Sequence, residues 1–404
     1  MTQTPAQRFT HCGSRAICLV AWVLLSGLLA GCRHAEPPAR PVRVATYNTA
    51  LSRDTEGALH AAFATGQDAK ARLVAEVLQR TRPDIVLLQE IDYDPTGKAY
   101  ADFQRRYLGV AQNGAEPIRY EYVYAPPVNT GVLAEVDLDG DGKITRPNDC
   151  YGYGLFEGHY GMVVLSRYPI DTDHVKDLRE KRWVSLPDQR VPEDYYSDAA
   201  RSALRLSSKT HADVRILLER SALNLWISHP TPPAFDGPED RNGRRNADEI
   251  ALWNWYYAKH QRMRTRELRK FPESPSYLFD HYIIMGDLNA DPNDGSSRRG
   301  AIQQLIDRPW LNDVVPTSRG GAQAARLQAG ANLTHKTDPA ADTADFGDTG
   351  RGPGNLRVDY VLPSANLDVV ASGVYWPTRD DPHAYLNKAS DHKLVWIDIA
   401  LDDD

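Results

Sequence analysis

The chain has 404 residues, of which 42% are hydrophobic and 25% are charged, and its formal net charge is −7. This is an ordinary globular composition, with enough length for one large domain or two small ones. An acidic protein has no overall field that gathers polyanions, so the charge argues against avid, non-specific nucleic-acid binding, although a local basic patch stays compatible with it.

The N-terminal residues 1–31 have the pattern of a targeting segment. Arg8 and Arg15 precede an apolar run from Ala16 to Ala30 that is short for a membrane span. The run ends before Cys32 in small residues, which resembles a bacterial lipoprotein signal. By that resemblance the chain is cut before Cys32, which then carries lipid, and residues 32–41 form a tether. We expect an exported protein anchored to the outer membrane or the cell surface; an ordinary secretory signal or a membrane anchor is the alternative.

Cysteine usage leaves no disulfide framework. The four cysteines stand at positions 12, 18, 32 and 150, so after cleavage and lipidation Cys150 has no partner. We expect Cys150 to be a small buried residue rather than a nucleophile, because no base motif lies beside it.

The first predicted elements of the mature chain are two strands that end in polar residues. Residues 42–48 are rich in β-branched side chains and end in Asn48, which predicts a strand. Residues 67–80 have helical periodicity. The apolar run 85–88 predicts a second strand and is followed by Gln89 and Glu90. A glutamate after four apolar residues needs a partner. Either an arginine pairs with it or it binds a metal ion, and we favour the metal ion because other polar residues also follow predicted strands.

Residues 137–149 resemble the calcium loop of an EF-hand. Asp137, Asp139 and Asp141 occupy positions one, three and five, glycine occupies position six, and Lys143 would contribute its carbonyl oxygen. Position twelve departs from the pattern, because Asn148 replaces the bidentate glutamate, and no helical pattern flanks the loop. We expect an isolated structural Ca²⁺ site inserted in the domain; a solvated acidic turn is the alternative.

The middle of the chain contains one further strand end with a titratable residue. Residues 161–166 and 223–228 are predicted strands, residues 171–200 are charged and irregular, and residues 202–207 alternate like a strand. His229 follows the strand at 223–228 and precedes a rigid proline-rich segment. Residues 247–269 are predicted to be helical, with an aromatic face in the core. Three arginines precede that helix and either clamp substrate phosphates or form a solvated loop: Arg241, Arg244 and Arg245.

A short apolar stretch, 282–285, delivers two polar side chains together. Asp287 and Asn289 are two residues apart, so in extended chain they point to the same side, and Gly286 allows close approach to the backbone. An acceptor beside a donor suits a metal-bound water or a phosphate oxygen. A plain Asp/Asn turn is the alternative.

The C-terminal part contains two further strands with polar ends. Residues 297–307 are predicted to be helical and residues 317–354 form a loop rich in glycine, alanine and aspartate. The predicted strand 356–362 carries Asp359 on a run that should be buried. Asp391 and His392 directly precede the terminal strand, 393–399.

Six motifs in this order resemble the endonuclease/exonuclease/phosphatase superfamily. The resemblance spans residues 42–399 and rests on Tyr47-Asn48, Gln89-Glu90, Ser228-His229, Gly286-Asp287-Leu288-Asn289, Val358-Asp359-Tyr360 and Ser390-Asp391-His392. It implies one domain over residues 42–401, an α/β/β/α sandwich of four layers in which two mixed β-sheets pack face to face with helices outside.

The resemblance also implies roles for these residues. Glu90, aided by Asn48 and Asp391, would bind Mg²⁺ or Mn²⁺. Asp287 and Asn289 would position water and phosphate. His392 would touch the phosphate with Asp359 behind it, and His229 would protonate the leaving oxygen or stabilise charge. The general base stays unassigned.

We therefore expect a metal-dependent phosphoesterase, monomeric and membrane-anchored through Cys32, that hydrolyses a phosphomonoester or phosphodiester outside the cytoplasm. An extracellular, sequence-nonspecific endonuclease and a phospholipid hydrolase at the membrane are the alternatives within this class. A calcium-stabilised binding module without catalysis is the alternative from another class. The complete set of polar strand ends favours catalysis, and the loops that decide the substrate have no readable pattern.

Overall fold

The computed structural model describes residues 40–219, 221–270, 281–347 and 352–400. The expected targeting segment, Cys32 and most of the tether lie outside these residues. Backbone contacts group Pro41–Asp404 into one compact unit. Among the described residues, no helix combines the length and the apolar character needed to cross a bilayer.

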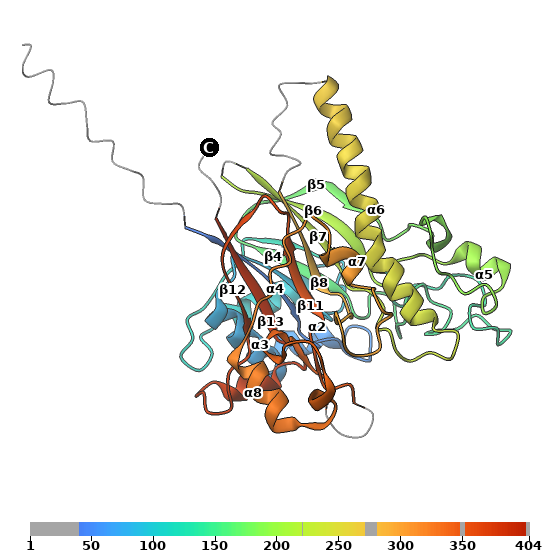
Figure 1. Ribbon diagram of the computed structural model, residues 1–404. Helices are drawn as coiled ribbons and strands as arrows, with labels where there is room; N and C mark the ends of the chain where they lie inside the picture. The colour runs from blue at the N-terminus through green and yellow to red at the C-terminus, as the bar shows by residue number, and fades with distance from the viewer. Residues whose placement is uncertain (1–39, 220, 271–280, 348–351, 401–404) are drawn as a thin grey trace, which may run out of the picture. The chain divides into compact units, whose positions relative to one another are not determined.

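The first sheet contains the N-terminal and C-terminal strands side by side (Figure 1). Strands β1 and β2 run parallel, and the other neighbours are antiparallel. In spatial order the strands are β12 (Asp368–Tyr375), β13 (Leu394–Ala400), β1 (Val42–Asn48), β2 (Ile85–Gln89), β4 (Met162–Ser166) and β3 (Tyr122–Tyr124).

The second sheet is built from the middle of the chain. Strands β7 and β8 run parallel, and the other neighbours are antiparallel. In spatial order the strands are β11 (Asp359–Pro363), β8 (Tyr282–Asp287), β7 (Ala222–Ser228), β6 (His211–Leu217) and β5 (Ile170–Asp177). A separate pair joins β9 (Ala344–Asp345) to β10 (Asn355–Leu356).

Alternation along the strands divides the core into layers, because successive side chains point to opposite faces of a sheet. Val44 and Leu87 of the first sheet meet Ile227 and Met285 of the second in one apolar cluster. On its other face the first sheet packs against α2 (Ala58–Thr65), α3 (Ala69–Thr81) and α4 (Lys98–Phe103). The second sheet packs against α6 (Arg241–Lys270) and α7 (Gln303–Ile306). The predicted four-layered sandwich is confirmed.

Several predicted elements differ from the structure. The range 171–200 was expected to be irregular, but it holds most of β5, η2 (Trp183–Ser185) and the start of α5 (Asp198–Ala203). Strand β5 is a largely exposed, charged edge strand, so it lacks the apolar alternation that marks a half-buried strand. The expected strand 202–207 is wrong, since the next strand, β6, begins only at His211.

The helix predictions also need correction. Helix α6 begins at Arg241 rather than at residue 247, and α7 is much shorter than the predicted 297–307. The expected loop 317–354 contains α8 (Arg319–Gln328), whose glycine and alanine content hides its periodicity. The remaining short helical turns are η1 (Gln104–Leu108), η4 (Gly330–Thr334), η5 (Pro339–Ala341) and η6 (Ala384–Lys388).

Strand direction explains where the polar strand ends meet. The parallel strands β1 and β2 finish at the edge where the antiparallel β13 starts. In the second sheet, β7 and β8 finish at the edge where β6 and β11 start. Strands β1 and β2 also lie against β8, so the two edges face each other. Residues that are far apart in the sequence therefore converge at one end of the sandwich.

Candidate active site

The carboxylate of Asp287, at the end of β8, is the centre of the convergent cluster. Its Oδ2 accepts a hydrogen bond from Asn48 Nδ2 at 3.0 Å and lies 3.2 Å from His229 Nε2 and 3.6 Å from His392 Nε2. Its Oδ1 accepts from the backbone N–H of Asn289 at 2.9 Å. Four residues from three other strand ends and from the following turn thus surround one buried carboxylate.

The same contacts keep Asp287 ionised. Burial alone would raise the pKa of this carboxyl group, but the nearby imidazoles of His392 and His229 and the bond from Asn48 outweigh burial and hold the pKa well below its usual range. A permanently charged carboxylate orients hydrogen-bond donors and is a weak proton acceptor.

Three backbone positions at these strand ends have uncommon dihedral angles. Glu90 and Asn289 have φ angles of 53° and 51°, in the left-handed region. Asparagine tolerates this region, but glutamate does so at a cost of about 1 kcal/mol. Gly286 has φ 144°, and a Cβ there would lie 1.9 Å from the carbonyl oxygen of Ser228, so the close approach predicted for this glycine is to a neighbouring strand. These turns aim Glu90 and Asn289 away from the strand direction.

Asp359 and His392 form a buried pair behind the centre. Asp359 lies opposite Asp287 in the register of β11 and β8, and its Oδ2 is 2.9 Å from His392 Nδ1. Burial would lower the pKa of His392, but the carboxylates of Asp359, Asp287 and Asp391 outweigh burial and raise it well above the usual value. His392 is therefore an imidazolium at neutral pH.

His229 has the opposite protonation state. Burial lowers its pKa, the charge of Lys209 lowers it further, and Asp287 only partly offsets this. A neutral His229 donates through Nε2 to Asp287, while its Nδ1 is buried and has no hydrogen-bond partner among the described residues. Two histidines at one carboxylate thus differ in charge.

The predicted metal ligands Glu90 and Asp391 lie next to this cluster. Oε1 of Glu90 accepts from Asn48 Nδ2 at 3.0 Å, and Asp391 is exposed, with its Oδ1 3.2 Å from Ser390 Oγ. Burial lowers the pKa of Lys70, and Asp391 and Glu90 both oppose this, so the two carboxylates lie near the same ammonium group. Accessible carboxylate oxygens of this kind are the ligands that a hard divalent cation such as Mg²⁺ prefers.

Asn48 connects two of these carboxylates, and a triad of buried titratable side chains lies next to it. Asn48 presents its NH₂ group to Glu90 and Asp287, while its Oδ1 accepts from the Ala50 N–H at 3.1 Å, so it bridges the carboxylates in this arrangement. Ligand atoms of Asp287, Asp359 and His392 also lie within 4.8 Å of one another. The two ring nitrogens of His392 face the carboxylates of Asp287 and Asp359. The triad is therefore a chain of ion pairs rather than a set of metal ligands.

The three predicted substrate arginines are used differently. Arg245 is buried and donates to backbone carbonyls of Leu206, Tyr151 and Arg205, so it supports the fold. Arg241 pairs with Glu239. Arg244 is half-buried, and its Nε has no hydrogen-bond partner among the described residues. Of the three, Arg244 is the one with a buried Nε that lacks a carboxylate or carbonyl partner in the described part of the chain, and Arg245 is committed to the backbone.

The predicted calcium loop is a self-contained turn. Oxygens of Asp137, Asp139 and Asp149 lie within 4.8 Å of one another. Asp149, which follows position twelve, occupies the closing position and accepts from the backbone N–H groups of Leu138 and Thr145 at 2.6 and 2.7 Å. Asp141 bonds the N–H of Lys143 instead and is not part of the cluster.

Asn246 and Glu249 of α6 hold the loops at the strand ends together. Sequence patterns did not predict this role. Asn246 Nδ2 donates to the carbonyl oxygens of Thr231 and Leu288 at 2.9 and 3.0 Å. The fully buried Glu249 accepts from the backbone N–H groups of Ser208 and Thr231, both at 2.6 Å. The sequence did contain one signal for this role. Two polar residues, three positions apart, lie on the helix face that otherwise carries apolar residues.

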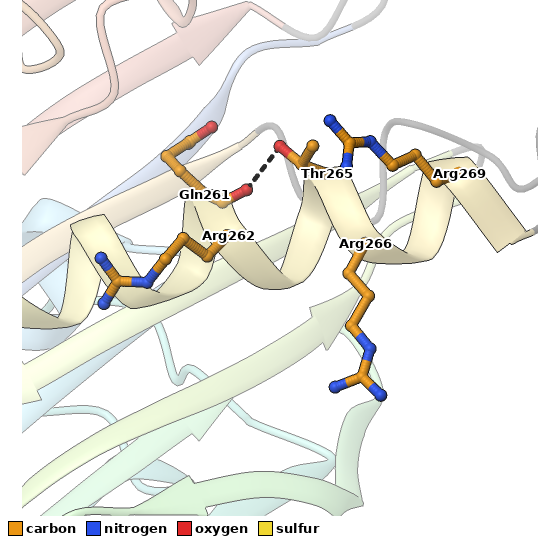
Figure 2. Close-up of a pocket in the computed structure, with 5 residues that line it drawn as sticks. All are labelled: Gln261, Arg262, Thr265, Arg266 and Arg269. Carbon is orange, nitrogen blue, oxygen red and sulfur yellow. Dashed lines mark hydrogen bonds between the residues drawn. The ribbon is translucent and has the colours of Figure 1, made fainter.

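A surface hollow of about 500 Å³ lies at the other end of α6 (Figure 2). Its lining consists of Gln261, Arg262, Thr265, Arg266 and Arg269. One helix supplies all of them, none is a carboxylate or a histidine, and Gln261 is about 18 Å along the helix from Glu249. The hollow is separate from the strand-end cluster.

Comparisons with known proteins point to one family. The model of the Endonuclease/Exonuclease/phosphatase family matches residues 45–392. A search of curated protein sequences found no match. Similar solved structures include an endonuclease/exonuclease/phosphatase from Beutenbergia cavernae, with 18% identity and a TM-score of 0.47 over 90% of this chain and 72% of that one.

Two further similar structures have named activities of their own. One is a mannosyl-6-phosphatase from Bacteroides thetaiotaomicron, with 11% identity and a TM-score of 0.45 over 89% of this chain and 100% of that one. The other is the human Nocturnin catalytic domain, with 13% identity and a TM-score of 0.44 over 90% and 95% of the two chains. These scores are low, so the assignment depends on the family match.

Proposed function

Since the chain belongs to the endonuclease/exonuclease/phosphatase family, whose members are hydrolases acting on phosphate ester bonds, we propose that it is a Mg²⁺- or Mn²⁺-dependent phosphoesterase that works outside the cytoplasm. The observation that carries this proposal is the ring of donors around the buried Asp287 carboxylate, beside the accessible carboxylates of Glu90 and Asp391.

Glu90 and Asp391 would hold the metal ion. The ion would neutralise charge on the phosphate oxygens and lower the pKa of water. Asn48 links the metal side of the site to the catalytic side, because its NH₂ group bonds both Glu90 and Asp287. Mg²⁺ and Mn²⁺ both suit such oxygen ligands.

The protein's own groups divide the remaining work. His392, charged and held by Asp359, contributes positive charge and an N–H group where negative charge develops on the phosphate. Asp287 fixes the orientation of both imidazoles. Asn289 closes the turn beside it, because its backbone N–H donates to Asp287 and its side-chain amide donates to the Pro230 carbonyl oxygen. Burial and the charge of Lys209 lower the pKa of His229, which makes this imidazole less suited to protonating a leaving oxygen than the family resemblance implies.

One panel assay tests the proposal. Supercoiled DNA, p-nitrophenyl phosphate, bis(p-nitrophenyl) phosphate and an inositol phosphate are offered with EDTA, Mg²⁺ or Mn²⁺. We expect cleavage of at least one ester that EDTA abolishes and Mg²⁺ or Mn²⁺ restores. Activity that is indifferent to EDTA contradicts a metal-dependent mechanism, and no cleavage of any ester under all conditions favours a binding module.

The anchor needs a test of its own. We propose export and lipidation at Cys32 because of the small residues before it, and a Cys32→Ser variant should then leave the membrane fraction and lose incorporation of labelled palmitate. An unchanged distribution of this variant contradicts the lipoprotein proposal and leaves the phosphoesterase proposal untouched.

A further inference from the structure

Lys209 is a buried cation that none of the roles above uses. It lies two residues before His211, which pairs with Ser228 across β6 and β7, and His229 follows Ser228 directly. Both chain ends extend to the same sheet edge, so Lys209 lies beside the strand-end cluster. Only 7% of the residue is exposed.

The backbone around Lys209 is fixed on both sides. The N–H of Asn129 donates to the Lys209 carbonyl oxygen at 2.9 Å, and its side chain donates to the carbonyl oxygen of Ser207 at 2.8 Å. The N–H and hydroxyl groups of Ser208 both donate to Glu249 Oε1. Gly152 permits this packing, because a Cβ there would lie 1.8 Å from the Ser208 carbonyl oxygen. The backbone that carries the lysine is thus fixed before any ligand arrives.

The charges around Lys209 are those of the active site. Burial lowers the pKa of its ammonium group, and the carboxylates of Glu90, Glu249 and Asp287 oppose that shift. Lys209 in turn lowers the pKa of His229. The ammonium group is therefore within electrostatic range of these four side chains.

These carboxylates already have donors of their own. Glu249 accepts at both oxygens, from Ser208 and Thr231, and Asp287 accepts at both oxygens. Within the described part of the chain, the Lys209 ammonium group makes no hydrogen bond and no ion pair within 4.0 Å. Three donors are therefore free for an anion that enters the cluster.

We infer that Lys209 binds a non-bridging oxygen of the substrate's phosphate group. This inference rests on the proposed phosphoesterase function. A lysine supplies a compact point charge with three donors, which suits a tetrahedral oxyanion. It also explains why an acidic site tolerates a negatively charged substrate, because the lysine and the charged His392 face the phosphate from the protein side.

Phosphate binding and turnover test the inference together. Inorganic phosphate is titrated calorimetrically into the full chain with Mg²⁺ present, and bis(p-nitrophenyl) phosphate hydrolysis is measured in parallel. For Lys209→Met we expect about tenfold to hundredfold weaker phosphate binding and a comparable loss in kcat/KM. The control, Lys259→Met, removes the same charge from an exposed position on α6 and should leave both values unchanged.

The outcomes separate this inference from the proposed function. If Lys209→Met folds and binds phosphate as the wild type does, Lys209 is not a phosphate ligand. Tighter Mg²⁺ binding with unchanged phosphate affinity would show that it only balances the carboxylates, which also overturns the inference. Should the methionine variant fail to fold by circular dichroism, Lys209→Gln gives the same readout. A wild type that cleaves no ester defeats the proposed function instead.

Discussion

The strand-end cluster and the loop at 137–149 both gather carboxylates, but they are built in opposite ways. In the cluster, Asp287 receives donors from side chains brought together by distant strands. In the loop, Asp137 accepts from the N–H groups of Gly140 and Gly142, within its own turn. The loop satisfies itself locally and largely in solvent, whereas the cluster keeps charges buried by long-range packing.

The two regions differ in the unfavourable free energy that their carboxylates add to the folded state. Burying ionised groups away from water is unfavourable unless partners compensate, and such arrangements concentrate at functional sites. The loop's carboxylates cost less, because Asp139 is exposed, Asp137 is half-buried, and the buried Asp149 accepts from two nearby backbone N–H groups. The comparison therefore supports the proposed catalytic role of the cluster and gives the loop only a stabilising role as a Ca²⁺ site. The predictions below test that division.

The largest expected effect is that of Asp287→Asn. The substitution keeps the size of the side chain but removes the charge that orients both imidazoles, so we expect kcat to fall by about 10³-fold or more. Steady-state hydrolysis with Mg²⁺ measures this, and thermal unfolding followed by circular dichroism checks that the fold remains. A folded variant with near wild-type kcat would place catalysis elsewhere.

A smaller loss is expected for Asp359→Asn, which acts only through His392. Without the carboxylate at 2.9 Å, the pKa of His392 falls, so less of the imidazolium is present at neutral and alkaline pH. We expect activity to fall about 10- to 100-fold. The alkaline limb of the pH–rate profile should also move to lower pH, because the imidazolium loses its proton earlier. A uniform loss with an unshifted limb would mean that Asp359 only supports packing.

The loop should give no catalytic effect at all. We expect Ca²⁺ to raise the unfolding temperature of the wild type by several degrees, because a ligand that binds only the folded state stabilises it. The double variant Asp137→Asn, Asp139→Asn should lose this response and keep its kcat with Mg²⁺. If kcat follows Ca²⁺ occupancy of the loop, the division between the two regions is wrong.

Much of the fold was accessible from sequence because its central strands are buried on both faces. The apolar runs ending at Asn48, Gln89 and Ser228 predicted their strands almost to the residue. The exposed edge strand β5 and the alanine-rich α8 escaped, since solvent-facing charge and small side chains leave no periodic signal. Edge strands are recognised by their neighbours, which no local pattern records.

The candidate site divides in the same way. Side chains at the ends of apolar strands were predictable because a polar residue stands out after such a run. Lys209, Asn246 and Glu249 were not, because their meaning depends on what packs against them: a loop before a strand and one face of a long helix. The two proton states of His229 and His392 likewise depend on burial and neighbouring charges. Sequence order suggests which motifs meet, and packing decides their chemistry.

The smallest expected effect concerns Asp342, and it tests whether a buried carboxyl group is by itself a sign of function. This carboxyl group is 3% exposed and has no side-chain hydrogen bond among the described residues. Burial, with the charges of Asp291, Asp294 and Asp338, raises its pKa to about 8. The folded state thus holds a proton that the unfolded state releases near pH 4. Stability from this group is present below that pH and is lost as pH rises through about 8.

Asp342→Asn should therefore stabilise the protein by about 1 kcal/mol at pH 8 and by less at pH 5. Urea unfolding followed by tryptophan fluorescence at the two pH values measures this, with Asp368→Asn on the exposed part of β12 as a charge-matched control. Unchanged ester hydrolysis in the stabilised variant would show that a buried carboxyl group becomes functional only where other buried groups converge on it, as they do at Asp287. A variant destabilised at pH 8 would instead mean that the ionised Asp342 carboxylate has a partner that the fold depends on.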